Sequence, residues 1–103
     1  MMLLNSISLN MVAAFPATIH VEEIPLVRAR ELATDHLSAV GHADTAAVFG
    51  EQLVMPVQPN RVNVSLKSGD MVLVGQYRGP RLPEGATTLP EGATIQWLLV
   101  TVE

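Results

Sequence analysis

Short apolar segments of two kinds alternate along this chain, and their order restricts the architectures that it can adopt. Two segments carry apolar residues at helical spacing, 26–33 and 43–53, and a shorter one at 9–15 follows the N-cap residue Ser8 and ends at Pro16. The other segments have the alternation or the β-branched runs of strands, and they are 2–4, 18–22, 37–40, 61–66, 71–74 and 95–102. Strands that alternate with helices predict an α/β domain in which helices flank one mixed β-sheet.

A β-hairpin is the clearest local prediction. Residues 61–66 alternate strictly between polar and apolar side chains, and residues 71–74 form a continuous apolar run. The tripeptide Ser68-Gly69-Asp70 between them has the composition of a turn, so the two segments are expected to pair as antiparallel strands. Residues 55–60 contain two prolines and are expected to form a loop.

The region 75–92 is rich in glycine and proline and is also predicted to be a loop. It contains the hexapeptide Leu-Pro-Glu-Gly-Ala-Thr at residues 82–87, and the same six residues recur at 89–94. Repeat folds need at least three copies to bury a continuous core. We therefore interpret the two copies as a duplication within one loop.

The length and composition indicate one compact domain that leaves some apolar surface exposed. With 103 residues, the chain has the size of a single domain, which we expect to span residues 1–103. Apolar residues make up 49% and charged residues 16% of the sequence, which excludes intrinsic disorder. A domain this small cannot bury all of its apolar residues. We expect a second copy of the chain to cover the remainder in a two-fold homodimer.

The composition also limits the classes of ligand. The net charge of −4 argues against binding to long DNA or RNA, although a few arginines can still hold a small anion. The chain has no cysteine and no histidine pair at metal-binding spacing, so neither a metal nor another cofactor is expected. No apolar run approaches the length that spans a membrane, and the first residues lack the positive charge of a signal peptide. A cytoplasmic location is expected.

His42 is the most specific candidate for chemistry. It follows a glycine and directly precedes the predicted helix 43–53, so its ring would lie beside free backbone N–H groups, which attract anions and disfavour the imidazolium form. A histidine there can donate a proton to a leaving oxygen. The alternative is a histidine that caps the helix or packs against the sheet. His20, within a strand, and His36, at a helix end, are interpreted as structural.

Three arginines are candidate anion-binding groups. The chain has six basic residues, and three of them, Arg61, Arg78 and Arg81, lie in the half of the sequence that is rich in proline and glycine. There they fall in predicted loops or at a strand edge, where binding groups are commonly found. The alternative for each is an exposed arginine that only water contacts.

Few reactions fit so small a set of groups. The sequence has neither the glycine-rich loop that holds the phosphates of nucleoside triphosphates nor the fingerprint that binds dinucleotides. Ser6 or Ser8 could join His42 and Asp44 in a catalytic triad, but no nucleophile-elbow motif surrounds either serine. Metal-free transesterification of RNA remains, because the 2′-hydroxyl of the substrate is then the nucleophile. The protein needs to supply only orientation, a proton donor and a cation.

Four segments, taken in order, carry a resemblance to one known family. They are Leu4–Met11, Ala39–Ala46, Asn60–Val62 and Arg81–Gly85, and they extend over nearly the whole chain. The Gly-His pair at 41–42 and the Arg-Leu-x-Glu-Gly motif at 81–85 are the most specific parts. Together they resemble the small viral and bacterial ring nucleases that act as anti-CRISPR proteins against type III systems, also called ring nuclease 2.

This resemblance implies a mixed sheet flanked by helices, a two-fold dimer, and metal-independent cleavage of cyclic tetra-adenylate to linear di-adenylates with a 2′,3′-cyclic phosphate. Cyclic tetra-adenylate activates the accessory nucleases of type III CRISPR defence, so its destruction antagonises that immunity. By motif match, the general acid falls on His42, and the catalytic arginine and glutamate fall on Arg81 and Glu84. The implied ligand-binding residues are Asn5, Ser8, Asn10, Arg61 and, with one residue inserted in the segment 75–80, Gln76.

The chain departs from the family pattern in the loop that carries the motif. Pro80 and Pro83 stiffen this loop, and the second hexapeptide replaces a longer helical segment. Three functions are therefore weighed: a ring nuclease, a dimer that sequesters a cyclic oligonucleotide without cleaving it, and a phage interaction protein without a nucleotide ligand. The joint presence of His42, Arg81 and Glu84 favours the first. If the chain is encoded by a phage, its location would be the host cytoplasm.

Overall fold

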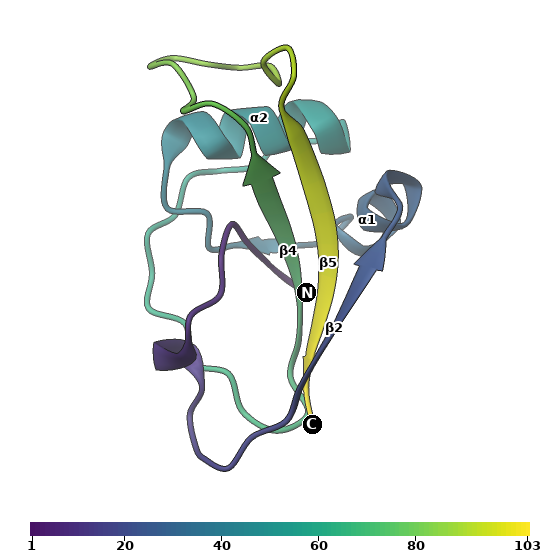
Figure 1. Ribbon diagram of the computed structural model, residues 1–103, viewed down its shortest axis with the longest axis vertical. Coiled ribbons are helices and arrows are strands. Elements are labelled where there is room, and N and C mark those ends of the chain that lie inside the picture. The colour runs from purple at the N-terminus through teal and green to yellow at the C-terminus, as the bar shows by residue number, and fades with distance from the viewer.

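The computed structural model describes all 103 residues, which form one α/β domain. Five strands build a single mixed sheet, and two α-helices and one 3-10 turn complete the fold (Figure 1), which confirms the predicted fold class. Neither helix is long and apolar enough to cross a membrane. In chain order, the elements are β1 (Met2–Leu4), the 3-10 turn η1 (Leu9–Met11), β2 (Ile19–Ile24), α1 (Leu26–Leu32), β3 (Leu37–Ser38), α2 (Ala43–Leu53), β4 (Met71–Arg78) and β5 (Thr94–Val102).

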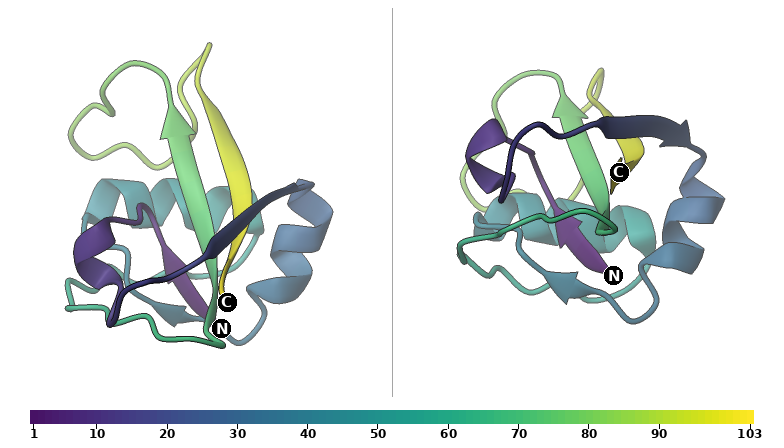
Figure 2. Two further views of the ribbon diagram at one scale, coloured as in Figure 1. Left: turned by 60° about the horizontal axis from the view of Figure 1, so that its bottom comes forward. Right: turned by 90° about the horizontal axis from the view of Figure 1, so that it is seen from below.

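The strands lie in the order β2-β5-β4-β1-β3. Strand β1 runs parallel to both β3 and β4, whereas β5 is antiparallel to both β4 and β2. Every residue of β4 pairs with a residue of β5, so these two strands form one long hairpin at the centre of the sheet. Its connection, residues 79–93, leaves the sheet at the end of the molecule where α2 lies (Figures 1 and 2).

The two α-helices cover one face of the sheet. Ala29 of α1 and Phe49 of α2 are fully buried against a cluster that includes Leu73 and Trp97, and the ring centroids of Phe49 and Trp97 are 5.2 Å apart. Gly75 of β4 permits this close approach, because a Cβ there would lie 2.5 Å from Cζ of Phe49 and 2.8 Å from Cζ3 of Trp97. Helix α2 is thereby fixed against the strand that leads into the 79–93 connection.

Irregular chain, rather than helix, covers the opposite face. The segments that follow β1 and precede β4 pack there, and Val12 and Leu66 form an isolated parallel bridge between them. Leu66 joins the sheet residue Val72 in a second buried cluster. This covering is incomplete toward the β2 edge of the sheet, where Val21 is 54% exposed.

The predicted hairpin of 61–66 with 71–74 is wrong. Residues 61–66 form no strand: their only β-bridge joins Leu66 to Val12, and Leu66 and Val64 meet the sheet through side-chain packing alone. The physical reason is that β4 already pairs with β1 along one edge and with β5 along the other, so no edge is left for a further strand. Strand β4 is also longer than the apolar run 71–74, since it continues to Arg78.

The helix predicted at 9–15 is reduced to the 3-10 turn Leu9–Met11. Ser8 precedes it with an extended backbone but makes no capping hydrogen bond through its side chain. Instead of continuing the helix, the Ala13 N–H donates to the carbonyl of Leu66 at 2.8 Å. By contrast, the strand at 2–4 and the helix at 43–53 have the predicted bounds, and the remaining elements differ from the predictions only at their ends.

Candidate functional site

A cleft of about 850 Å³ lies between the N-terminal end of α2 and the 79–93 connection. This volume is in the range of small-molecule sites. His42, Arg81 and Glu84, the three catalytic candidates, all line the cleft, although the histidine is distant from the other two in sequence. The other lining residues are Asp44, Thr45, Tyr77, Gly79, Leu82 and Pro83.

His42 occupies the N-cap position of α2, with φ −117° and ψ 133°. Its carbonyl accepts a helical hydrogen bond from the Ala46 N–H at 2.9 Å, but its side chain does not cap the helix. The ring is exposed at the cleft and makes no hydrogen bond within the chain. The side chain of His42 therefore neither caps the helix nor is buried against the sheet. The free N–H groups of the first turn of α2 lie next to it, and they favour an anionic ligand.

The two ends of the 79–93 connection are held together beside the cleft. The hydroxyl of Tyr77 donates a hydrogen bond to the carbonyl of Pro80. Gly79 has φ +152°, and a Cβ there would lie 2.7 Å from Cβ of Ala93, so only glycine fits at this contact. These constraints fix where the chain leaves β4, and Arg81 follows immediately.

Glu84 lies on a tight turn that is tied to α2. The Ala86 N–H donates to the carbonyl of Pro83 at 3.0 Å, and Gly85 has φ +81°, as a type II turn requires at its third position. The Gly85 N–H donates in turn to Oδ1 of Asp44 in the first turn of α2, at 3.1 Å. This hydrogen bond joins the connection to the helix end that carries the histidine.

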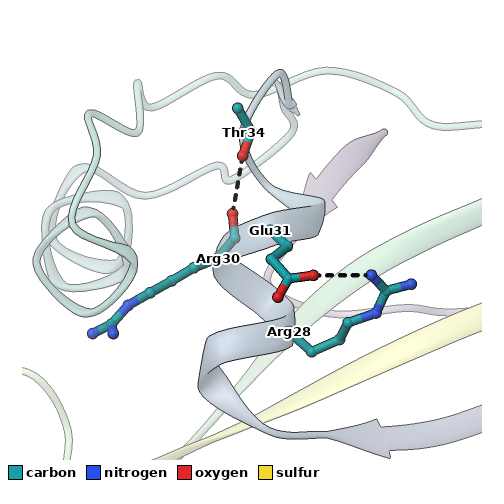
Figure 3. A network of polar contacts seen from close by, with 4 residues as sticks. All are labelled: Arg28, Arg30, Glu31 and Thr34. Carbon is teal, nitrogen blue, oxygen red and sulfur yellow. Dashed lines mark hydrogen bonds and ion pairs between the residues drawn. The ribbon is translucent and has the colours of Figure 1, made fainter.

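The arginines of the first half of the chain take part in structural contacts, whereas those of the second half do not. Arg28 and Glu31 form the one ion pair of the chain, with 3.3 Å between Nη1 and Oε2 (Figure 3). Arg30 donates two hydrogen bonds, at 3.1 and 2.9 Å, to the carbonyl of Gln52 near the end of α2. No ion pair or side-chain hydrogen bond engages the other arginines, which are Arg61, Arg78 and Arg81.

A second pocket, of about 460 Å³, adjoins the cleft and shares Thr45 and Tyr77 with it. Asn5 and Gln76, two of the predicted ligand-binding residues, line this pocket. Most of its other lining is apolar and comes from β2, β4 and β5 together with Ile7. An apolar wall with two amide groups suits a flat heterocycle that also offers hydrogen-bonding atoms.

The remaining predicted ligand-binding residues line neither cavity. Ser8 and Asn10 are exposed at η1. Arg61 is exposed as well, but its side chain lies beside Gly41, since a Cβ on that glycine would be 3.7 Å from Nε of Arg61. The Asn60 N–H donates to the carbonyl of Val40 at 2.7 Å and holds this segment next to the start of α2. Within one chain, Arg61 is thus near the cleft and the two η1 residues are apart from it.

Two residues that line the cleft, Tyr77 and Asp44, were not predicted from the sequence to lie there. Tyr77 is the penultimate residue of β4, a strand that was expected to stop at residue 74, and Asp44 anchors a loop that is distant in sequence. The triad considered for Asp44 is not formed, because His42 makes no hydrogen bond to it or to a serine. No group of three or more histidine, aspartate or glutamate side chains is arranged to hold a metal ion.

The order of elements, the mixed sheet and the cleft at the end of α2 together define a class of small α/β proteins. Residues 1–96 match the family described as STIV B116-like, and the chain belongs to this family. Among solved structures it is similar to B116 of Sulfolobus turreted icosahedral virus, with a TM-score of 0.77 and 26% sequence identity over 97% of each chain. No curated protein sequence gives a significant match.

Proposed function

We propose that this member of the viral B116-like family is a metal-independent ring nuclease that cleaves cyclic tetra-adenylate and thereby antagonises type III CRISPR immunity, in the cytoplasm of the cell that makes it. The supporting observation is the cleft, in which the candidate acid His42, the candidate cation Arg81 and the candidate acceptor Glu84 meet. Each of these side chains is exposed, and none is engaged in an ion pair. They are therefore free to contact a ligand.

The proposed reaction needs no group from outside the substrate and the chain. The 2′-hydroxyl of one adenosine attacks the adjacent phosphorus while its proton passes to the carboxylate of Glu84. His42 donates a proton to the departing 5′-oxygen, and the P–O5′ bond breaks as the P–O2′ bond forms. Arg81 stabilises the negative charge that collects on the phosphoryl oxygens. Two such cuts give linear di-adenylates with a 2′,3′-cyclic phosphate.

A two-fold dimer would match the symmetry of this substrate. Two copies each of Arg61 and Arg81 provide four cations for the four phosphates of the ring. The incompletely covered sheet face, where Val21 is 54% exposed, supplies apolar surface for a second copy. We expect light scattering at micromolar concentration to give twice the chain mass of 11.1 kDa. A monomer would contradict the shared site.

The test of the activity is incubation of the protein with labelled cyclic tetra-adenylate in the presence of EDTA, with separation of the ring from di-adenylate. We expect His42→Ala to lower the single-turnover rate about 10²- to 10⁴-fold and to retain binding. His20→Ala is the matched control, because His20 is exposed on β2 and lines neither cavity. A wild-type rate for His42→Ala would overturn the assignment of the acid.

One observation favours the sequestering dimer as a second candidate. No side chain or backbone group of the chain accepts a hydrogen bond from the ring of His42, so nothing in the free protein fixes its orientation. Catalytic histidines are commonly oriented by such a partner. Tight binding of cyclic tetra-adenylate without formation of di-adenylate would identify this function. The absence of any binding would leave a phage interaction protein.

A further inference from the structure

A row of three polar side chains crosses three strands on the sheet face that no α-helix covers. Gln76 of β4 donates from Nε2 to Oε1 of Gln96 on β5 at 2.9 Å, and Gln96 donates from Nε2 to Oε1 of Glu23 on β2, also at 2.9 Å. Gln76 and Gln96 are direct cross-strand partners. Gln76 lines the pocket beside the cleft, whereas the other two residues line neither cavity. The proposed reaction gives no role to Gln96 or Glu23.

The carboxylate at the end of the row determines the direction of every hydrogen bond in it. An ionised carboxylate only accepts hydrogen bonds, so Gln96 must turn its NH₂ group toward Glu23. Its carbonyl oxygen then faces Gln76 and can only accept, so Gln76 must also donate. An amide alone can be reversed without changing its shape. Here, the reversed orientation would place two carbonyl or carboxylate oxygens against each other.

This order leaves the carbonyl oxygen of Gln76 unused. Its Nε2 donates to Gln96 on β5, and the oxygen lies on the other arm of the same planar amide, away from this hydrogen bond. Asn5, directly after β1, lines the same pocket as Gln76. No hydrogen bond within the chain ends on this oxygen, since the one side-chain hydrogen bond of Gln76 leaves from Nε2. The pocket is thus given a hydrogen-bond acceptor at a defined position.

We propose that Glu23 and Gln96 are positioning residues that hold Gln76 as an acceptor and so make the site selective for a ligand base with an exocyclic amino group. The selectivity rests on the proposed function, because it concerns the base of the cyclic oligonucleotide. Adenine presents an amino donor next to a ring-nitrogen acceptor, which matches the free oxygen and the second N–H of Gln76. Hypoxanthine has a carbonyl oxygen in place of the amino group, and two acceptors would then face each other.

The decisive variant is Glu23→Lys, because an ammonium group only donates and should reverse the row. Gln96 would then accept from the new side chain and donate to Gln76, which would present N–H groups to the pocket. Glu22→Lys is the matched control. Glu22 is exposed on the same strand, its side chain points to the opposite face, and it has the same change of charge. Both variants place the new charge on an edge strand, where folding tolerates it.

The first measurement does not need a ligand. In ¹H–¹⁵N spectra of the 103-residue chain, Glu23→Lys should shift the side-chain NH₂ signals of both Gln96 and Gln76, and Glu22→Lys should leave both in place. Unshifted Gln76 signals in Glu23→Lys would overturn the proposal, because the orientation of the Gln76 amide would then not depend on the side chain at position 23. This result is independent of whether the protein is a ring nuclease.

The second measurement compares affinities for cyclic tetra-adenylate and for its inosine analogue. The wild type and Glu22→Lys should prefer the adenine ring by about tenfold or more, and Glu23→Lys should lose or reverse that preference. The ratio of the two affinities removes the general attraction of the added lysine for phosphates. Equal ratios in all three proteins would overturn the assigned selectivity. If neither ring binds to the wild type, the proposed function fails together with the selectivity, while the NH₂ signals still decide whether the row orients Gln76.

Discussion

The two copies of Leu-Pro-Glu-Gly-Ala-Thr have one sequence and one local structure but different surroundings. In each, the alanine N–H donates to the proline carbonyl at 3.0 Å, and the glycines, Gly85 and Gly92, both have φ +81°. The hexapeptide therefore forms the same type II turn in both places, because its glycine stands at the third position and adopts the positive φ that this turn requires. The different roles of the two turns must therefore depend on the residues that surround each turn.

The surroundings assign the two turns to different tasks. The first turn carries Glu84 into the cleft and is tied to α2 by the hydrogen bond between the Gly85 N–H and Asp44. The second turn ends at Ala93, which is buried against the start of the connection and leads directly into β5. Its glutamate, Glu91, is exposed and lines neither cavity. One copy thus belongs to the candidate site and the other to the hairpin.

The largest difference in cleavage rate between the two copies is expected when their glutamates are substituted. Glu84→Gln removes the carboxylate that would accept the proton of the 2′-hydroxyl, and single-turnover cleavage of cyclic tetra-adenylate should fall about 10²- to 10⁴-fold. Glu91→Gln makes the same chemical change in the same turn and should cleave at the wild-type rate. Equal losses in the two variants would show that the turn as such, rather than its place at the cleft, is what matters.

Loss of the hydrogen bond that ties the first turn to Asp44 is expected to have a smaller effect on the cleavage rate. Asp44→Ala removes the acceptor for the Gly85 N–H, so Glu84 is held less firmly over the cleft, and cleavage should fall about tenfold. Asp44→Asn keeps a carbonyl oxygen at the same place and should restore most of the rate. If the asparagine variant is as slow as the alanine variant, the negative charge of Asp44 acts on the reaction directly and the anchoring interpretation is wrong.

The same contrast between local and distant information explains what could be predicted from sequence. The helix 43–53, with His42 before it, follows from local signals, and the motif at 81–85 indicated two further cleft residues, Arg81 and Glu84. The failed hairpin has a non-local cause, because residues 61–66 have strand alternation but β4 has no free edge for them. The contact between Asp44 and Gly85 joins residues 41 positions apart, and no local sequence pattern in either segment predicts it.

The smallest expected effect concerns the glycines, and it separates folding from function most directly. A Cβ at Gly85 or at Gly92 would touch nothing within 4 Å, and both have φ +81°, so alanine at either site meets only backbone strain. Gly85→Ala and Gly92→Ala should each lower the free energy of unfolding by about 1 kcal/mol, measured by denaturant titration. Cleavage should respond only to Gly85→Ala, because relaxation of that turn displaces Glu84 and the N–H bound to Asp44. A Gly92→Ala variant that cleaves as slowly as Gly85→Ala would mean that the two turns move as one unit, and the second copy would then belong to the site as well.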